Sequence, residues 1–389
     1  QKPRGIWLTE RVWEPALPKT LHLAGIEYTL LDEEHFHYSG VRDIHSYYMT
    51  ESEGHPLKIF PIDKKLRYAI PFRPIEEIKS YFDEIRDKGG IAILGDDGEK
   101  FGLWPGTYDW VYKESWLNKF LKFLENEGAQ TCTYSEALEK YMPAGKVYLP
   151  PSSYEEMMEW TLDPDEFKIF RELKESSPVQ ARRFLRGGIF PEYFLKYRES
   201  DHLHKRMLMV SEKVNSGQDE AARRELYKGQ GNDPYWHGVF GGLYLPHLRE
   251  AAYYHLLQAE NRLFSKPRWQ ETDYDRDGKV EVFHEGEIFN LLLKPSLGGA
   301  IVELDYKPLA RNLTDVLSRR RESYHKKEEG KKEGKTIHDL AKEFPAGASV
   351  LLRYDWHPRY TLLDHFLHPK TTLEDFARID YGEQGDCVN

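Results

Sequence analysis

Short apolar segments alternate with amphipathic segments along the first 150 residues, and this alternation restricts the fold more than any other feature of the chain. Residues 5–8 and 26–32 have the composition of buried strands, and residues 17–24 between them are predicted to form a helix. A second amphipathic helix is predicted for residues 75–87, followed by an apolar strand at residues 91–94. Such alternation is typical of a parallel α/β sheet or barrel, whose active site lies beyond the carboxyl ends of the strands.

Two of these predicted strands end in carboxylates. Glu10 follows the first strand, between Trp7 and Trp13, and Asp97 follows the strand at residues 91–94. A charged side chain at the mouth of an apolar strand costs free energy unless the protein uses it. Cleavage of a sugar bond with retention uses such a pair, one ionised nucleophile and one protonated acid about 5–5.5 Å apart.

The residues alone leave a structural interpretation open beside the catalytic one. Arg11 can help to keep a neighbouring carboxylate ionised, but Glu10 and Arg11 also fit an ordinary surface pair. Asp96 and Glu99 lie close to Asp97 in sequence, and their charges would raise the pKa of an acid catalyst. A turn with a capping aspartate has the same sequence pattern.

Metal ligation is the weaker interpretation wherever the sequence suggests it. His35 and His37 follow the strand at residues 26–32, but a histidine pair in a loop is more often structural or solvated. Residues 273–277 hold three acids before Gly278, yet they lack the ligand spacing and the closing glutamate of a calcium loop. We interpret them as an acidic turn, and we expect no metal and no cofactor.

Three domains are predicted from the change of pattern along the chain. Residues 1–150 are expected to form a partial, incomplete (β/α) barrel, residues 151–266 a helical subdomain that completes the cleft, and residues 267–389 the beginning of a β-sandwich. The other segments predicted are β-like runs at residues 57–60 and 66–70 and strands at 279–284, 287–293 and 300–304. One helix each is predicted at residues 116–124, 154–160, 164–173, 179–185, 191–214, 220–228 and 245–264.

Composition excludes some partners. The net charge of −10 argues against a nucleic-acid partner, which favours a basic face. Cys132 and Cys387 are far apart in sequence and suggest no disulfide framework, so we expect a reducing, cytoplasmic location. No apolar run approaches the roughly 20 residues that a membrane span requires, and we expect no membrane partner.

Three stretches of the chain resemble signature blocks of glycoside hydrolase family 57, in the order that the family has them. They are residues 5–13, residues 96–108 and residues 232–238. The resemblance is strongest to the 4-α-glucanotransferase and α-amylase branch. It implies a retaining double displacement on α-1,4-glucans (maltooligosaccharide, starch or glycogen) within an incomplete (β/α) barrel, with a helical subdomain and a C-terminal β-sandwich.

The resemblance also assigns roles to residues of this chain. It makes Glu10 the nucleophile and Asp97 the acid/base, and it implies no metal and no cofactor. The residues that would contact the glucan, by stacking on sugar faces or by holding hydroxyls, are Trp7, Arg11, Glu99, Trp104, Asp233, Trp236 and His237.

Two blocks of the family do not occur in this chain. Both would lie before Gln1, so we expect an interior fragment that lacks the first barrel strands and is inactive or poorly folded by itself. Several alternatives stay open: a hydrolysing α-amylase, a branching enzyme, a metal-dependent deacetylase, or an inactive glucan-binding protein. A homodimer also stays open.

Overall fold

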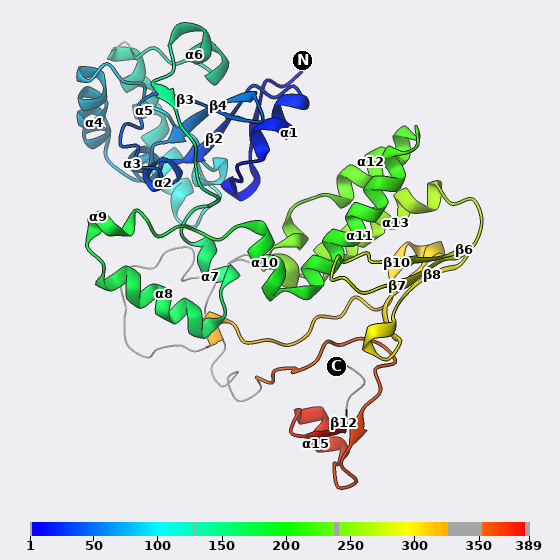
Figure 1. Ribbon diagram of the computed structural model, residues 1–389. Helices are drawn as coiled ribbons and strands as arrows, with labels where there is room; N and C mark the ends of the chain where they lie inside the picture. Colours follow the sequence, from blue (N-terminus) through cyan, green and yellow to red (C-terminus); the bar gives the residue numbers. More distant parts are fainter. Residues whose placement is uncertain (1, 128, 237–240, 326–351, 386–389) are drawn as a thin grey trace. The chain divides into compact units, whose positions relative to one another are not determined.

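The computed structural model describes residues 2–127, 129–236, 241–325 and 352–385 (Figure 1). The chain divides into two compact units, which are considered one at a time. Unit 1 comprises Gln1–Thr161 and Phe167–Phe190, and unit 2 comprises Leu162–Glu166 and Pro191–Asn389.

Unit 1 is built on a five-stranded sheet with the order β1-β2-β4-β3-β5. Its strands are β1 (Gly5–Trp7), β2 (Tyr28–Asp32), β3 (Tyr48–Ser52), β4 (His55–Ile62) and β5 (Gly145–Lys146). β1, β2 and β4 are parallel neighbours, whereas β3 is antiparallel to β4. The strands predicted at residues 5–8, 26–32 and 57–60 are therefore confirmed, and their carboxyl ends meet at one edge of the sheet (Figure 1).

Both faces of this sheet are buried at the neighbouring strands β2 and β4. Leu30 packs with Ile62 in the core cluster on one face, and Leu31 packs with Ile59 in the cluster on the other. Because successive side chains of a strand point to opposite faces, a strand covered on both sides needs apolar residues at nearly every position. This explains why β2 and β4 appear in the sequence as almost unbroken apolar runs.

Helices cover the sheet and continue beyond it. Their bounds are α1 (Leu17–Leu23), α2 (Glu33–Tyr38), α3 (Lys64–Ala69), α4 (Ile75–Asp87), α5 (Trp116–Asn126), α6 (Tyr134–Lys140), α7 (Met157–Thr161), α8 (Pro164–Ser176) and α9 (Val179–Arg182), with short turns η1 (Thr9–Arg11), η2 (Gly98–Lys100) and η3 (Asp109–Lys113). The predicted helices at residues 17–24 and 75–87 are confirmed as α1 and α4. Ile78 of α4 joins Trp116 and Phe120 of α5 in a separate buried cluster.

Two strand predictions in unit 1 are wrong. Residues 66–70 belong mainly to helix α3, because Asp63 caps its first turn by accepting from the Leu66 N–H at 3.0 Å. Residues 91–94 are not a strand. Ile93 is buried, but this segment contacts its neighbours through isolated backbone bonds, such as Asp63 N–H to Ile93 O at 3.1 Å, rather than through a ladder.

Unit 2 combines helices with an antiparallel sheet whose order is β10-β9-β8-β7-β6. The elements are α10 (Phe190–Lys196), α11 (Arg198–Asn215), α12 (Glu220–Gly229), η4 (Asp233–Tyr235), η5 (Gly242–Tyr244), α13 (Pro246–Arg262), β6 (Arg268–Thr272), β7 (Glu281–Glu285), β8 (Phe289–Lys294), η6 (Pro295–Leu297), β9 (Ala300–Tyr306), η7 (Lys307–Leu309), β10 (Arg311–Asn312), η8 (Ser323–His325), β11 (Phe366–Leu367), α15 (Leu373–Arg378) and β12 (Glu383–Gly385). The three strands predicted at residues 279–304 are confirmed. The single helix predicted at residues 191–214 is wrong, because Tyr197 leaves helical geometry and separates α10 from α11.

A buried ion cluster joins the helices of unit 2 to its sheet. Arg206 of α11 is 2% exposed and contacts Glu303 and Asp305 of β9 and Glu260 of α13. Buried charges of this kind are stable only when they are paired. The α/β class predicted from the sequence is confirmed, and no helix among the described residues is long and apolar enough to cross a membrane.

Candidate active site

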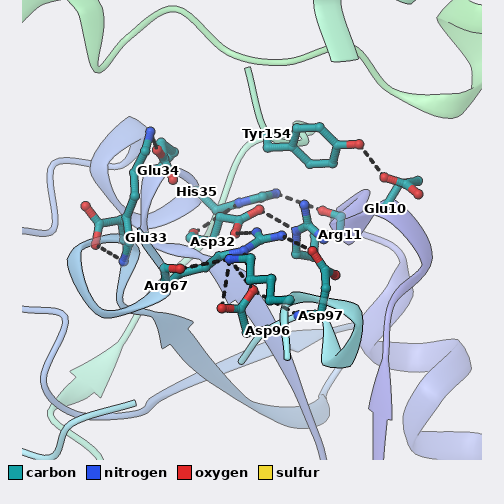
Figure 2. Close-up of polar contacts among 12 residues, drawn as sticks. Glu10, Arg11, Asp32, Glu33, Glu34, His35, Arg67, Asp96, Asp97 and Tyr154 are labelled. Carbon is teal, nitrogen blue, oxygen red and sulfur yellow. Dashed lines mark hydrogen bonds and ion pairs between the residues drawn. The ribbon is translucent and has the colours of Figure 1, made fainter. Parts of the chain in front are cut away.

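The acid-bearing segments lie at the carboxyl edge of the parallel strands of unit 1. Glu10 lies in η1, directly after β1, and Asp32 ends β2. Gly95 brings the segment of Asp97 to the same edge, because a Cβ at that glycine would lie 3.1 Å from side-chain atoms of Leu30 and Trp7. Figure 2 shows the polar side chains that gather there: Glu10, Arg11, Asp32, His35, Arg67, Asp96, Asp97 and Tyr154.

Glu10 is presented by a turn in the left-handed backbone region. Its φ is 49° and that of Arg11 is 47°. Each such residue costs on the order of 1–3 kcal/mol and persists only where its surroundings hold it. The turn is closed by the Arg11 N–H, which donates to Leu8 O at 2.9 Å, and the Glu10 carboxylate accepts a hydrogen bond from the Tyr154 hydroxyl (Figure 2).

Tyr154 remains a donor to Glu10. Burial raises the pKa of the Tyr154 phenol well above its ordinary value, and the Glu10 charge adds to that shift. The ring of Tyr154 also lies under the Arg11 guanidinium, 4.4 Å from the centroid. The tyrosine therefore orients the carboxylate and packs against the residue that follows it.

Asp32 and His35 stabilise the same turn through contacts with Arg11. Arg11 Nε donates to Asp32 Oδ2 at 2.6 Å, and both side chains are buried. The ring nitrogens of His35 lie 2.9 Å from Arg11 O and 3.1 Å from Asp32 O. Burial lowers the pKa of His35, although the charge of the Asp32 carboxylate opposes this shift. A neutral imidazole can donate to only one of these two carbonyls. Both ring nitrogens face carbonyl oxygens, so His35 is structural and does not face a metal site with His37.

Asp32 itself stays ionised in this setting. Burial would raise the pKa of its carboxyl, but the charges of Arg11 and Arg67 outweigh that effect and hold the pKa below its ordinary value. The Asp32 carboxylate is thus the fixed anion around which two guanidinium groups are arranged.

Arg67 connects this anion to the second acid-bearing segment. From α3 it reaches Asp32 at 3.2 Å, Asp96 at 3.2 Å and Asp97 at 3.3 Å (Figure 2). Lys100 donates to Asp96 at 2.8 Å. Ion pairs therefore run from Arg11 beside Glu10, through Asp32 and Arg67, to Asp97.

The local charges around Asp97 differ from the sequence prediction. We expected repulsion from neighbouring acids, but Arg67 and Lys100 pair with Asp96 and offset its charge. Burial raises the pKa of Asp96, and its hydrogen bond with Lys100 opposes the shift. Glu99 is exposed, and its carbonyl oxygen accepts from the Trp104 N–H at 3.1 Å.

Two indole rings lie close to these acids in unit 1. Trp7 is 40% exposed although it belongs to β1, and its ring lies against Gly95. Trp104 stacks on Phe72 with a centroid separation of 6.1 Å. Trp104 is half-buried. Accessible aromatic rings beside carboxylates are suited to stacking on the apolar faces of sugars.

The third predicted block lies in unit 2. Asp233 is exposed in η4, and Trp236 is 8% exposed and donates from its indole N–H to Asn232. His237 lies outside the described residues. The structure thus brings Trp7, Glu10, Arg11 and Asp97 together in unit 1, and the roles predicted for the unit 2 residues stay predictions.

Sequence reasoning missed two residues of the site. Tyr154 is 144 residues from its partner Glu10, and no local pattern marks it. Arg67 was assigned to a strand, although the Asp63 cap three residues before Leu66 is a helix signal that could have placed it correctly.

Comparison with known proteins places this site in a family. Residues 1–150 match the model described as glycosyl hydrolase family 57. Residues 188–263 match the middle domain of alpha-amylase/4-alpha-glucanotransferase, and residues 273–389 match its C-terminal domain.

Individual relatives agree with these matches. The chain is 45% identical to 4-alpha-glucanotransferase of Thermococcus litoralis, over 99% of this chain and 60% of that protein. It is 44% identical to an alpha-amylase of Pyrococcus furiosus, over 98% of this chain and 60% of that protein. The crystal structure of the Thermococcus litoralis 4-alpha-glucanotransferase superposes with a TM-score of 0.87 and 43% identity, over 99% of this chain and 59% of that one. The chain spans about 60% of the length of these relatives, and the family 57 match covers the part of the chain that holds Glu10 and Asp97.

Proposed function

We propose that the protein is a retaining enzyme acting on α-1,4-glucans, and that it transfers glucan segments as a 4-α-glucanotransferase. The family 57 match over residues 1–150 and the names of the relatives support this assignment. The observation that carries the proposal is the position of Glu10 and Asp97, both at the carboxyl edge of the parallel strands and connected through Arg11, Asp32 and Arg67.

In the proposed mechanism, Glu10 is the nucleophile. Its carboxylate oxygen attacks C1 of the sugar while the C1–O4 bond breaks, and a β-glucosyl ester forms. Asp97 donates its proton to the departing O4. It then accepts a proton from an acceptor hydroxyl, whose oxygen attacks C1 and releases Glu10. A retaining reaction of this kind needs the two carboxyl groups about 5–5.5 Å apart.

The glucan-binding residues are proposed on the same basis. Stacking on indole rings and hydrogen bonds to carboxylates together give affinity for a polymer without one fixed polar geometry. The proposed set is Trp7, Arg11, Glu99 and Trp104 in unit 1, with Asp233, Trp236 and His237 in unit 2.

The division of the chain into three domains is part of the same proposal. We propose an incomplete (β/α) barrel over residues 1–150, a helical subdomain over 151–266 and the start of a β-sandwich at 267–389. Matches of separate family models to residues 1–150, 188–263 and 273–389 support this division. A cytoplasmic location and a homodimer stay predictions.

Hydrolysis is the second candidate, because several relatives are named alpha-amylase. Transfer and hydrolysis share every step up to the glycosyl ester, and they differ in whether a sugar hydroxyl or water attacks it. Incubation with maltotriose distinguishes them. We expect oligosaccharides longer than the substrate, whereas glucose and maltose alone would show hydrolysis.

Variants connect the products to the proposed residues. Glu10→Gln and Asp97→Asn should each abolish product formation, whereas the matched control Glu14→Gln, three residues after the end of η1, should retain it. Retained turnover in Glu10→Gln would overturn the assignment of the nucleophile. Product from the unaltered chain would also show that the expectation of a fragment inactive by itself is wrong.

A further inference from the structure

The turn between β6 and β7 in unit 2 carries three aspartates at alternate positions. Asp273, Asp275 and Asp277 precede Gly278, whose φ is 84°. Asp273 Oδ2 accepts from the Gly278 N–H at 3.2 Å, and Asp277 Oδ1 accepts from the Lys279 N–H at 2.8 Å. Asp275 Oδ1 likewise accepts from the Asp277 N–H at 3.3 Å, so among the described residues one oxygen of each aspartate has no backbone donor.

Glu281 brings a fourth carboxylate to this turn from the first position of β7. Its side chain is fully buried, and neither of its carboxylate oxygens has a hydrogen-bond partner among the described residues. Asp273 Oδ1 is also buried without such a partner. One carboxylate oxygen from each of Asp273, Asp275 and Glu281 lies within 4.8 Å of the others. Burial of unpartnered carboxylates so close together is costly unless a cation lies between them.

Lys294 supplies only part of the positive charge that this cluster needs. From the end of β8, its Nζ lies 2.5 Å from Asp275, 2.8 Å from Asp277 and 3.4 Å from Glu281 Oε1. No other cation forms an ion pair with these acids in the part of the chain that the structure describes. One ammonium offsets one of four carboxylates, and Asp273 and Glu281 Oε2 have no contact with it among the described ion pairs.

We propose that Asp273, Asp275 and Glu281 bind a divalent cation, and that this cation is calcium. The converging donors are all carboxylate oxygens, which calcium prefers, and no imidazole or thiolate that would favour zinc belongs to the group. Irregular loop geometry also suits calcium better than magnesium, which demands a near-ideal octahedron.

The proposed site revises the interpretation of residues 273–277 as a plain acidic turn. The closing glutamate was not recognised in the sequence because it is not part of the turn. Glu281 belongs to the next strand, three residues after Gly278, and only the fold brings it back. Asp277 remains the ion-pair partner of Lys294, which ends β8. The cation would connect the turn after β6 to Glu281 at the start of β7, next to that ion pair. Its role is to stabilise this sheet, apart from the candidate active site in unit 1.

Calcium binding can be measured directly. The purified protein is treated with a chelator, dialysed and titrated with calcium chloride by calorimetry, and terbium luminescence gives a second measure. We expect one site, and a thermal midpoint that rises with calcium concentration. Glu281→Gln should weaken binding at least about tenfold, because ligand charge sets the affinity of such sites. The matched control Glu271→Gln, an exposed position of β6, should bind as the unaltered protein does.

A half-buried ligand gives a second variant that perturbs the core less. Asp273→Asn should also weaken binding at least about tenfold, and it keeps the test valid if Glu281→Gln fails to fold. Absence of binding at millimolar calcium in the unaltered protein would overturn the proposal. Equal affinities in Asp273→Asn and in the Glu271→Gln control would overturn it too.

Discussion

The substitution Asp32→Asn tests how strongly the buried anion supports the turn that presents Glu10. Asp32 contacts Arg11 at 2.6 Å and Arg67 at 3.2 Å, and its side chain is 8% exposed. Removal of one partner of a buried ion pair leaves an uncompensated charge and costs about 3–5 kcal/mol. We therefore expect the free energy of unfolding at pH 7 to fall by about 3–5 kcal/mol.

The pH dependence of this loss follows from the lowered pKa of Asp32. A carboxyl with a depressed folded-state pKa stabilises the protein above its unfolded pKa of about 3.9, and that contribution disappears as the pH falls through the folded-state value. The difference between Asp32→Asn and the unaltered protein should therefore be complete near pH 7 and should narrow below about pH 4.

Urea unfolding at several pH values measures both effects. The control is Asp83→Asn, which removes an exposed pair with Arg86 at 2.6 Å in the same unit. Exposed pairs contribute about 0–1 kcal/mol, so the control should lose little stability. If Asp32→Asn loses no more than Asp83→Asn, or if its loss does not change with pH, the reasoning about the buried anion is refuted.

Three other substitutions give separate tests. Tyr154→Phe removes the donor to the Glu10 carboxylate, and we expect kcat to fall about 10- to 100-fold with little loss of fold, since hydrogen bonds to charged groups contribute about 1.5–3 kcal/mol; an unchanged kcat would contradict this. His35→Phe removes the donor to one of two buried carbonyls and should reduce the free energy of unfolding by about 1–3 kcal/mol, whereas His35→Gln should lose less in the same urea experiment. Arg206→Met removes the guanidinium that three buried carboxylates share and should destabilise unit 2 by about 3–5 kcal/mol, a loss that calorimetry would detect and whose absence would be inconsistent with the ion cluster.

Much of unit 1 could be predicted because burial on both faces leaves a clear trace in sequence. β2 and β4 are almost continuous apolar runs, and α4 has a regular apolar face, so both types of element were recognised. Residues 66–70 were wrongly predicted to form a strand. Leu66 and Ile70, which are four residues apart, are both buried, and the segment between them is short. Such a short apolar run fits a strand or a helix equally well, and only the Asp63 cap decides between them.

The contacts of the candidate site were beyond sequence reasoning for a different reason. Glu10 and Asp97 are marked locally, since each follows an apolar segment directly. Tyr154 and Arg67 are not marked, because their partners are distant in sequence and meet them only in the folded chain. Glu281 illustrates the same limit, since its unpartnered oxygens become evident only when β7 is in place beside the acidic turn.

The central claim is that Glu10 forms a covalent bond to the sugar. The most direct measurement is incubation of the purified protein with a mechanism-based glucosyl inhibitor, followed by proteolysis and mass spectrometry of the labelled peptide. Our account predicts one added sugar on the peptide that contains Glu10, and none in Glu10→Gln. A label on another carboxylate, with Glu10 unmodified, would contradict it.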